Sequence, residues 1–356
     1  MVLAISAPIL GIYSDILKKR KIFLIIASVL TCFFAFLLWF MDPTKNILIF
    51  FLVIIALGNI CFEISTVFYN ALLKEVSNTN NIGKISGIAW SLGYIGGVLS
   101  LIICFFLFVN PSETIFDLDK EKFEHIRIIG PFIGLWFLVF SIPSFIFIKE
   151  KKTKIKKINL IKHIKKTFLS IKKTTLKFLI SRMLYTDGLN TLFVFGGIYA
   201  ATLFNMSFSE IILFGITLNI SAGIGSVIFA LFDDKYGPRR IIKICLLSLI
   251  FICSLILLSD NKTLFWILGI GIGLFIGGLQ STSRSCMARL SKKNDQSRMF
   301  GIYGLSGKIT AFLGPFFVAL LTTTFNNQKA GFVSIIIFFI LGYLIIRNLK
   351  LPYYSK

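Results

Sequence analysis

Polar side chains occur inside a long apolar stretch, RMLYTDGLNTLFVFGGIY, that runs from residue 182 to residue 199. At about 100° per residue, Asp187, Asn190 and Thr191 fall on one face of a helix. Arg182 lies about 140° away from Asp187 around such a helix, so it does not pair with that carboxylate along the same helix. An ionisable group at membrane depth indicates a functional site. We therefore expect Asp187, Asn190 and Thr191 to line a cavity near the midplane, with the partner of Asp187 coming from another segment.

A second charge, Lys308, lies about ten residues into another apolar run, GLSGKITAFLGP, which is too deep for its ammonium group to reach the interface easily. A buried partner is expected for it, and Asp187 is one candidate. A permanent Asp187–Lys308 pair that holds two helices together is the alternative to a transport role for Asp187. No cofactor is expected, although a carboxylate at low dielectric can bind and release a proton, so proton coupling stays open.

Two further apolar runs each carry a polar helical face. In the first, the spacing i, i+4, i+7, i+11 places together Asn59, Glu63, Thr66 and Asn70. In the second, Gln280 and Arg284 share a face. Such a face needs a partner helix or a water-filled cavity. Glu63 and Arg284 are therefore candidates for contacts with a solute or with each other, and a structural clamp between helices is an equal alternative.

The composition is that of a membrane protein. Of 356 residues, 56% are hydrophobic and 15% are charged, which is too apolar for two or three soluble domains. The net charge of +22 comes from short clusters between apolar runs, as topology signals do, so nucleic-acid binding is not expected. The six cysteines lie within apolar segments without CxxC spacing, which favours buried free thiols. The two histidines lack further ligands at metal spacing, so no metal site is expected.

Apolar runs between charged or Pro/Asn/Gly-rich breaks predict an all-α membrane protein of about eleven transmembrane helices. The first, at about 1–15, is short. The others lie near 22–40, 47–73, 85–109, 128–148, 176–204, 209–232, 241–259, 264–289, 299–324 and 331–348. Basic connections alternate with connections of little positive charge. This alternation predicts a multi-pass protein of the plasma (inner) membrane with a cytoplasmic C-terminus.

The break at 149–175 differs from the other connections. Its sequence is rich in lysine, and apolar residues recur there at helical spacing. This pattern predicts an amphipathic helix on the cytoplasmic leaflet, with a solvated basic linker as the alternative. The linker would divide an N-terminal half bundle of about five helices, 1–148, from a C-terminal half bundle of six, 176–356.

The two halves repeat one another, which indicates internal symmetry. GIYSDILKKRK at 11–21 resembles ALFDDKYGPRR at 230–240, and CFEISTVFYNALL at 61–73 aligns without a gap to GLQSTSRSCMARL at 278–290. Gly87 and Gly93 then fall opposite Gly301 and Gly307. Three matches in the same order are hard to obtain by chance, so we expect two pseudo-symmetric halves.

The loop pattern G-x-x-x-D-x-x-G-x-R, present twice, resembles the loop motif of the major facilitator superfamily. The resemblance implies a helix bundle of two six-helix halves with alternating access. It assigns gating roles to Gly11, Asp15, Arg20, Asp234, Gly237 and Arg239. In the first copy Lys18 stands where the pattern has a glycine, and in the second Ala230 replaces the leading glycine. The alternative for the basic residues of the loops is that they only set topology.

The strings YTDGLNTLFVFGGIYA, FDDKYGPRR and GIYGLSGKITAFLGP are similar to the Atg22-like branch of that superfamily, also called UMF1, whose eukaryotic members are vacuolar amino-acid effluxers. The family's first helix has no counterpart before Met1, which predicts an N-terminally incomplete member.

The resulting expectation is a monomeric secondary transporter that moves a small polar solute, an amino acid or related metabolite, across the lipid bilayer. A non-transporting or degraded paralogue, such as a sensor, is the alternative. An enzyme is not expected, because HExxH, GxSxG and paired histidines are absent from the sequence.

Overall fold

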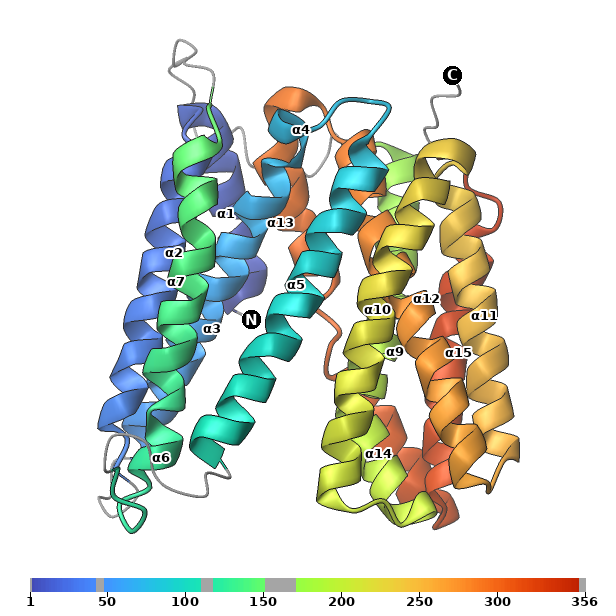
Figure 1. Ribbon diagram of the computed structural model, residues 1–356. Helices are drawn as coiled ribbons and strands as arrows, with labels where there is room; N and C mark the ends of the chain where they lie inside the picture. Colours follow the sequence, from blue (N-terminus) through green and yellow to red (C-terminus); the bar gives the residue numbers. More distant parts are fainter. Residues whose placement is uncertain (1, 43–47, 110–117, 151–170, 352–356) are drawn as a thin grey trace. The chain divides into compact units, whose positions relative to one another are not determined.

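The computed structural model describes residues 2–42, 48–109, 118–150 and 171–351, with side chains from residue 6 onward. Within these residues the regular structure is entirely helical (Figure 1). The N-terminal helices are α1 (Val2–Leu17), α2 (Arg20–Leu37), α3 (Leu48–Ala71), α4 (Leu73–Val76), α5 (Ile82–Cys104), α6 (Glu124–Arg127) and α7 (Ile129–Phe147). The C-terminal helices are α9 (Lys173–Phe204), α10 (Phe208–Tyr236), α11 (Pro238–Leu258), α12 (Lys262–Leu290), α13 (Gln296–Ser306), α14 (Leu313–Phe325) and α15 (Gln328–Ile346).

Each apolar run identified in the sequence, apart from the one at 299–324, corresponds to a helix. Among the described residues, eight helices are long and apolar enough to cross a membrane, and α14 and the end of α1 form shorter apolar helices. The 32-residue α9 is not among the eight, and its polar residues include Arg182, Asp187 and Asn190. The predicted amphipathic linker helix lies almost wholly in 151–170, outside the described residues.

The run at 299–324 is not one continuous helix, contrary to the sequence prediction. Helix α13 ends at Ser306, residues 307–312 form turns, and α14 begins at Leu313. Pro315 explains the break, because a proline ring clashes with the carbonyl group four residues earlier, here Ala311, and offers no N–H to it. Gly307, at the start of the turns, adds backbone freedom. The interruption therefore follows from the local sequence.

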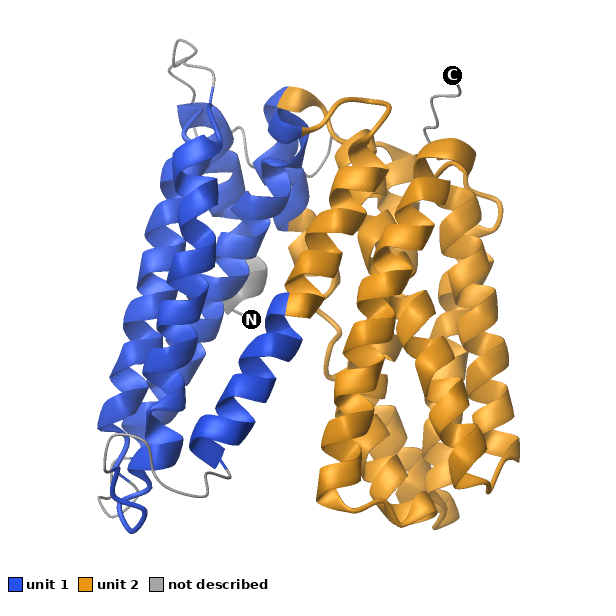
Figure 2. Cartoon of the chain, viewed as in Figure 1, with its two compact units in different colours: residues 1–76, 96–158, 294–301 blue, residues 77–95, 159–293, 302–356 orange. Residues whose placement is uncertain are grey.

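The described chain forms two compact units (Figure 2). Unit 1 comprises residues 1–76, 96–158 and 294–301, and unit 2 comprises residues 77–95, 159–293 and 302–356. Each unit thus includes a short segment from the other half of the sequence. The division into half bundles at 1–148 and 176–356 stays a prediction.

Unit 1 is centred on α2, which packs against both α3 and α7. Leu24 of α2 and Phe68 and Leu72, at the end of α3, form its buried apolar cluster. In unit 2 the largest contact joins α10 to α12, and α9 packs against α15. Glycines make the α10–α12 crossing close. A Cβ atom at Gly277 would lie 1.9 Å from the Ala222 carbonyl oxygen, so the two backbones touch at this position.

The α10–α12 crossing yields a stability prediction. Gly277→Ala should lower the free energy of unfolding by about 1–3 kcal/mol, because the added methyl group overlaps the α10 backbone. Gly215→Ala on α10 is the matched control, since a Cβ atom there meets nothing within 4 Å. Thermal unfolding of the purified protein in detergent measures both. Equal melting temperatures for the two variants would contradict the close crossing.

Candidate functional site

The first loop aspartate joins an arginine to the start of a helix. Asp15, which is 8% exposed near the end of α1, accepts a hydrogen bond from Nε of Arg20 at 2.9 Å and forms an ion pair with the same guanidinium at 2.8 Å. Its carboxylate also accepts from the backbone N–H groups of Ser297 at 3.2 Å and Arg298 at 2.8 Å. These N–H groups belong to the first turn of α13, where a negative charge is stabilised by the helix dipole.

Two more carboxylates complete this network in unit 1. Glu75 lies 3.4 Å from the Arg20 guanidinium, and Glu150 accepts from the backbone N–H groups of Arg20 at 2.7 Å and Lys21 at 3.0 Å. Glu150 therefore caps the N-terminus of α2 from the far end of the N-terminal half. The Arg20 side chain is held by Asp15 and Glu75 together.

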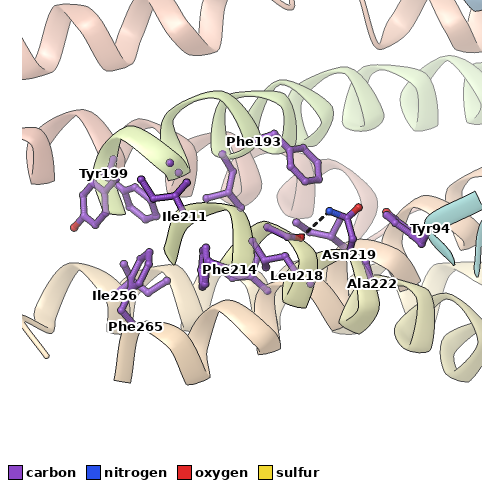
Figure 3. A pocket seen from close by; sticks show the side chains of 18 residues that line it. Tyr94, Phe193, Tyr199, Ile211, Phe214, Leu218, Asn219, Ala222, Ile256 and Phe265 are labelled. Atoms are coloured by element: carbon purple, nitrogen blue, oxygen red, sulfur yellow. Dashed lines mark hydrogen bonds between the residues drawn. The ribbon is translucent and has the colours of Figure 1, made fainter. Parts of the chain in front are cut away.

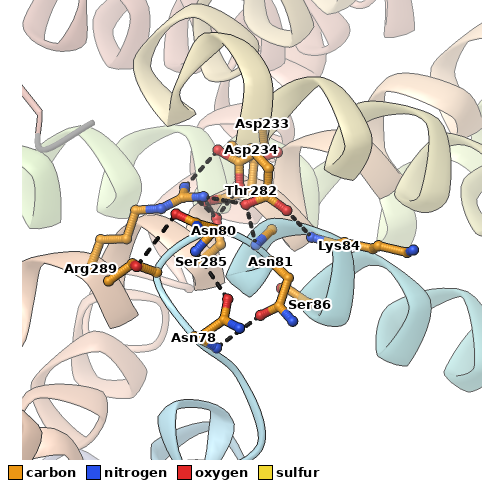
Figure 4. Close-up of polar contacts among 12 residues, drawn as sticks. Asn78, Asn80, Asn81, Lys84, Ser86, Asp233, Asp234, Thr282, Ser285 and Arg289 are labelled. Carbon is orange, nitrogen blue, oxygen red and sulfur yellow. Dashed lines mark hydrogen bonds and ion pairs between the residues drawn. The ribbon is translucent and has the colours of Figure 1, made fainter. Parts of the chain in front are cut away.

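The second loop repeats this arrangement within unit 2 (Figure 4). Asp234 accepts from the backbone N–H groups of Gly83 at 2.8 Å and Lys84 at 2.7 Å, at the start of α5. Arg289 at the end of α12 pairs with Asp233 and with Asp234, each at 2.7 Å. Asp233 is fully buried and also accepts from the Ser285 hydroxyl. A buried ion pair of this kind is costly to break from one side.

The two networks match in register. The alignment that sets Gly87 opposite Gly301 also sets residues 83 and 84 opposite 297 and 298, the positions that the two loop aspartates cap. A Cβ atom at Gly87 would meet the Ser226 carbonyl oxygen at 2.3 Å, and one at Gly301 would meet the Ala7 carbonyl oxygen at 2.7 Å. Each loop thus holds the N-terminus of one helix from the other half of the sequence. This geometry supports the predicted repeat, whose direct superposition stays a prediction.

Both loops turn through a left-handed residue. Gly237 has φ 83°, and Lys18, which stands where the sequence pattern has glycine, has φ 56°. The first loop therefore keeps a positive φ at the glycine position of the motif, although a lysine stands there. Gly11 also matters sterically, because a Cβ atom there would lie 2.5 Å from the Ser297 carbonyl oxygen. Arg239 donates to the backbone carbonyl of Arg347 near the C-terminal end of α15.

Arg284 of α12 bonds a residue of α5 within unit 2. It is 4% exposed, and it donates to the Ser86 hydroxyl at 2.9 Å and to the Ser86 carbonyl at 2.7 Å. Its guanidinium also lies over the ring of Trp90. Gln280, one turn earlier on α12, accepts from the Tyr94 hydroxyl at 2.6 Å. Arg284 and Gln280 thus each bond a residue of α5, and a solute-binding role for either stays a prediction.

The polar face of α3 belongs to unit 1. Asn59 is exposed and donates to the Ile55 carbonyl of its own helix. Glu63 is half-buried. A solute-binding role for Asn59 and Glu63 stays a prediction.

Asp187 differs from these charges. It is 1% exposed, and neither of its carboxylate oxygens has a hydrogen-bond partner among the described residues. Thr191 donates to the Asp187 backbone carbonyl at 2.6 Å, and Asn190 is half-buried. Arg182 lies elsewhere: it donates to the Tyr303 carbonyl at 2.5 Å and to Ser306 at 2.8 Å, and it stacks 3.4 Å above the Tyr303 ring.

Lys308 is not hydrogen-bonded to Asp187. It is exposed, and the Asp187 carboxylate accepts no hydrogen bond from any described residue. The permanent Asp187–Lys308 pair considered from the sequence stays a prediction. The Thr310 hydroxyl group lies near the Asp187 carboxylate, although the geometry falls short of a hydrogen bond.

A pocket of about 190 Å³ opens in unit 2 and does not include Asp187 (Figure 3). Its walls are largely apolar and come from α9, α10, α11, α12 and α15, with Tyr94 of α5 at one end. Asn219 brings an amide to its lining, and the Tyr199 ring also lines it, while the buried Tyr199 hydroxyl group has no hydrogen-bond partner in the described part of the chain. Gly196 and Gly215 keep space open, because a Cβ atom at either would meet nothing within 4 Å.

A family profile described as "Vacuole effluxer Atg22 like" matches residues 1–351. The chain belongs to this Atg22-like family. The "Uncharacterized MFS-type transporter YxiO" of Bacillus subtilis is 25% identical over 97% of this chain and 81% of the relative. "Autophagy-related protein 22-1" of Aspergillus fumigatus is 23% identical over 71% of this chain, which spans 46% of that relative.

Solved structures of major facilitator proteins share the fold of this Atg22-like chain. The proton:xylose symporter XylE matches with a TM-score of 0.78 at 10% identity, over all of this chain and 85% of the other. The transporter FucP in its outward conformation matches with a TM-score of 0.73 at 14% identity, over 99% and 90%. The chain is therefore an all-α membrane helix bundle of the major facilitator type, in a family of transporters rather than enzymes.

Sequence reasoning missed several members of the two networks. Arg289 lies within the repeated segment at 278–290 and bridges both aspartates of FDDKYG, but a basic residue at the end of an apolar run is also typical of a topology signal. Glu75 and Glu150 each follow the end of an apolar run, where a lone acid beside lysines was a usable signal. Ser86 carried no signal, because a serine in an apolar helix is unremarkable until its partner is known.

The left-handed residue of the first loop generates a prediction. Lys18→Gly should raise the free energy of unfolding by about 1 kcal/mol, because glycine adopts φ near 56° without the steric cost that a Cβ atom brings. Lys19→Gly is the control: Lys19 has φ −130°, so the change removes a lysine without relieving strain. Melting temperatures compare the two. A Lys18→Gly protein that melts no higher than Lys19→Gly would show that the loop lacks this strain.

Proposed function

We propose that this Atg22-like chain is a secondary transporter that moves a small polar solute, an amino acid or related metabolite, across a membrane by alternating access. The observation that carries the proposal is the matched pair of loop aspartates on the starts of α13 and α5. Each contact joins the two sequence halves through backbone N–H groups. Bonds of this type can form in one access state and separate in the other, without loss of folding within either half.

The pocket of unit 2 supports a small solute as cargo. Apolar walls with a few polar groups are typical of sites that bind a small molecule and fix its orientation. Asn219 offers an amide among the apolar walls, so a solute with both an apolar and a polar part fits these walls. The glycines at 196 and 215 set the available width.

We propose that the Asp187 carboxylate changes its interactions during the transport cycle. A carboxylate without a partner at membrane depth costs about 2.5–3.5 kcal/mol, so packing alone gives little reason for its presence. We further propose that the protein is a monomer in the plasma membrane, with the linker and the C-terminus in the cytoplasm. The alternation of basic connections supports this orientation.

Asp187 provides the test of transport. In proteoliposomes containing the full-length chain and a panel of radiolabelled amino acids, Asp187→Asn should fold normally but lower accumulation roughly tenfold or more, which corresponds to about 1.4 kcal/mol of lost interaction. The reason is that the amide keeps the shape of the side chain and removes its charge. Asp187→Ala should be equally impaired.

Asp260→Asn is the matched control, because Asp260 is 86% exposed and pairs only with the surface residue Lys329 among the described residues. It should transport as the unmodified protein does. Full solute accumulation by the Asp187→Ala protein would contradict a transport site in the stretch 182–199. Absence of uptake of every solute by the unmodified protein would favour the non-transporting alternative.

A further inference from the structure

Two glycines in the pocket of unit 2 have no packing role. A glycine inside a helix makes that helix less stable than alanine would, so its presence needs a packing or a functional reason. Gly225 of α10 has a packing reason, because a Cβ atom there would overlap the Leu274 carbonyl group. Gly196 of α9 and Gly215 of α10 have none, since a Cβ atom at either would meet no described atom within 4 Å. Both line the pocket, so they leave space free in it from two helices.

The pocket has an aromatic end and a polar end (Figure 3). Tyr199 and Phe265 lie at one end, and the Phe265 ring stacks on that of Phe214 with centroids 5.0 Å apart. Asn219 and Tyr94 lie at the other end. None of the described residues that line the pocket is charged. A charged group at the aromatic end would lose its hydration without a counter-charge, so that end accepts an uncharged, apolar part of a molecule.

The polar end presents hydrogen-bond acceptors. Asn219 donates through its amide nitrogen to the Gly215 carbonyl at 2.8 Å, and no described residue donates to its amide oxygen. Tyr94 donates its hydroxyl hydrogen to Gln280 at 2.6 Å, which leaves the Tyr94 oxygen able only to accept. Two uncharged acceptor oxygens at one end of a pocket fit the donor group of a solute, such as an amine or a hydroxyl group.

We propose that this pocket binds a solute by its two ends, with a hydrogen-bond donor group at Asn219 and Tyr94 and an uncharged apolar part toward Phe265. Gly196 and Gly215 are the specificity-determining residues, because their missing Cβ atoms decide how large an apolar part fits. That the bound molecule is also the transported one rests on the proposed function. The binding assignment itself rests on the lining of the pocket.

A series of straight-chain 2-amino acids measures the space in the pocket. Alanine, 2-aminobutyrate, norvaline and norleucine share one donor group and differ by single methylene groups. Uptake of each radiolabelled member is compared in proteoliposomes that contain the full-length protein, Gly196→Ala or Gly215→Ala. Each added methyl group should lower uptake of the longest member that the unmodified protein carries by about tenfold or more, because one methylene in an apolar pocket discriminates to that extent. Uptake of alanine should stay unchanged.

Two further variants separate the glycines from general effects. Gly97→Ala on α5 is the matched control, because a Cβ atom there also meets nothing within 4 Å and Gly97 does not line the pocket. It should keep the length profile of the unmodified protein. Asn219→Leu removes the acceptor oxygen and keeps the size of the side chain. It should lower uptake of every member by about tenfold, independent of length.

Binding is measured separately from transport. Melting temperatures of the purified full-length protein in detergent are recorded with each member of the series, since a ligand that binds the folded state raises the melting temperature. The rise should follow the same dependence on length in each variant as uptake does. A rise without uptake would leave the pocket assignment standing and remove the transporter function. Uptake with one length profile shared by the unmodified protein and both glycine variants would do the reverse.

The pocket assignment has further results that would overturn it. One is a melting temperature that no member of the series raises. Another is a loss of uptake in Gly196→Ala and Gly215→Ala that is equal for all four members, since a narrower pocket must act on the longer members first. A changed length profile in Gly97→Ala would overturn it as well.

Discussion

The need to satisfy charge inside an apolar bundle governs this structure. A lone charged side chain at membrane depth costs about 2.5–3.5 kcal/mol, so each one must bind another group or serve a purpose. Asp15 and Asp233 meet the requirement through arginines, and Arg284 meets it through Ser86 and Trp90. Asp187 does not, and its backbone carbonyl group lies against the start of α14. Asp15, Asp233 and Arg284 thus contact other segments of the chain, whereas the Asp187 carboxylate has no hydrogen-bond partner among the described residues.

The aspartates of the two loops bind the N-terminal ends of helices. Asp15 and Asp234 each bind two backbone N–H groups as well as an arginine. A helix N-terminus is already positive, so the carboxylate gains from the dipole without requiring a second buried cation. The contact needs no particular side chain on the capped helix, which explains why Ser297 and Arg298 can serve in one copy and Gly83 and Lys84 in the other. Two loops of different sequence therefore give the same geometry.

Much of the fold could be predicted because apolar length and charge clusters report membrane segments directly. The loop motif gave Asp15, Arg20 and Asp234 their place near helix ends, and the structure adds the helices they cap. The break at 307–312 was missed because a search for apolar length ignores Pro315. The partners of Arg284 could not be found, since Ser86 is almost 200 residues away in sequence and ordinary in type. Asp187 was found because an acid in an apolar run is rare, but its lack of a partner is visible only in three dimensions.

The state of the Asp187 carboxyl group tests the central claim most directly. Infrared difference spectra of the full-length protein, recorded as the pH is lowered, report whether a carboxylate takes up a proton. The account predicts a protonated carboxyl band that the Asp187→Asn variant lacks, because no described residue holds the Asp187 carboxylate in a hydrogen bond. Identical difference spectra for the unmodified protein and Asp187→Asn would contradict it.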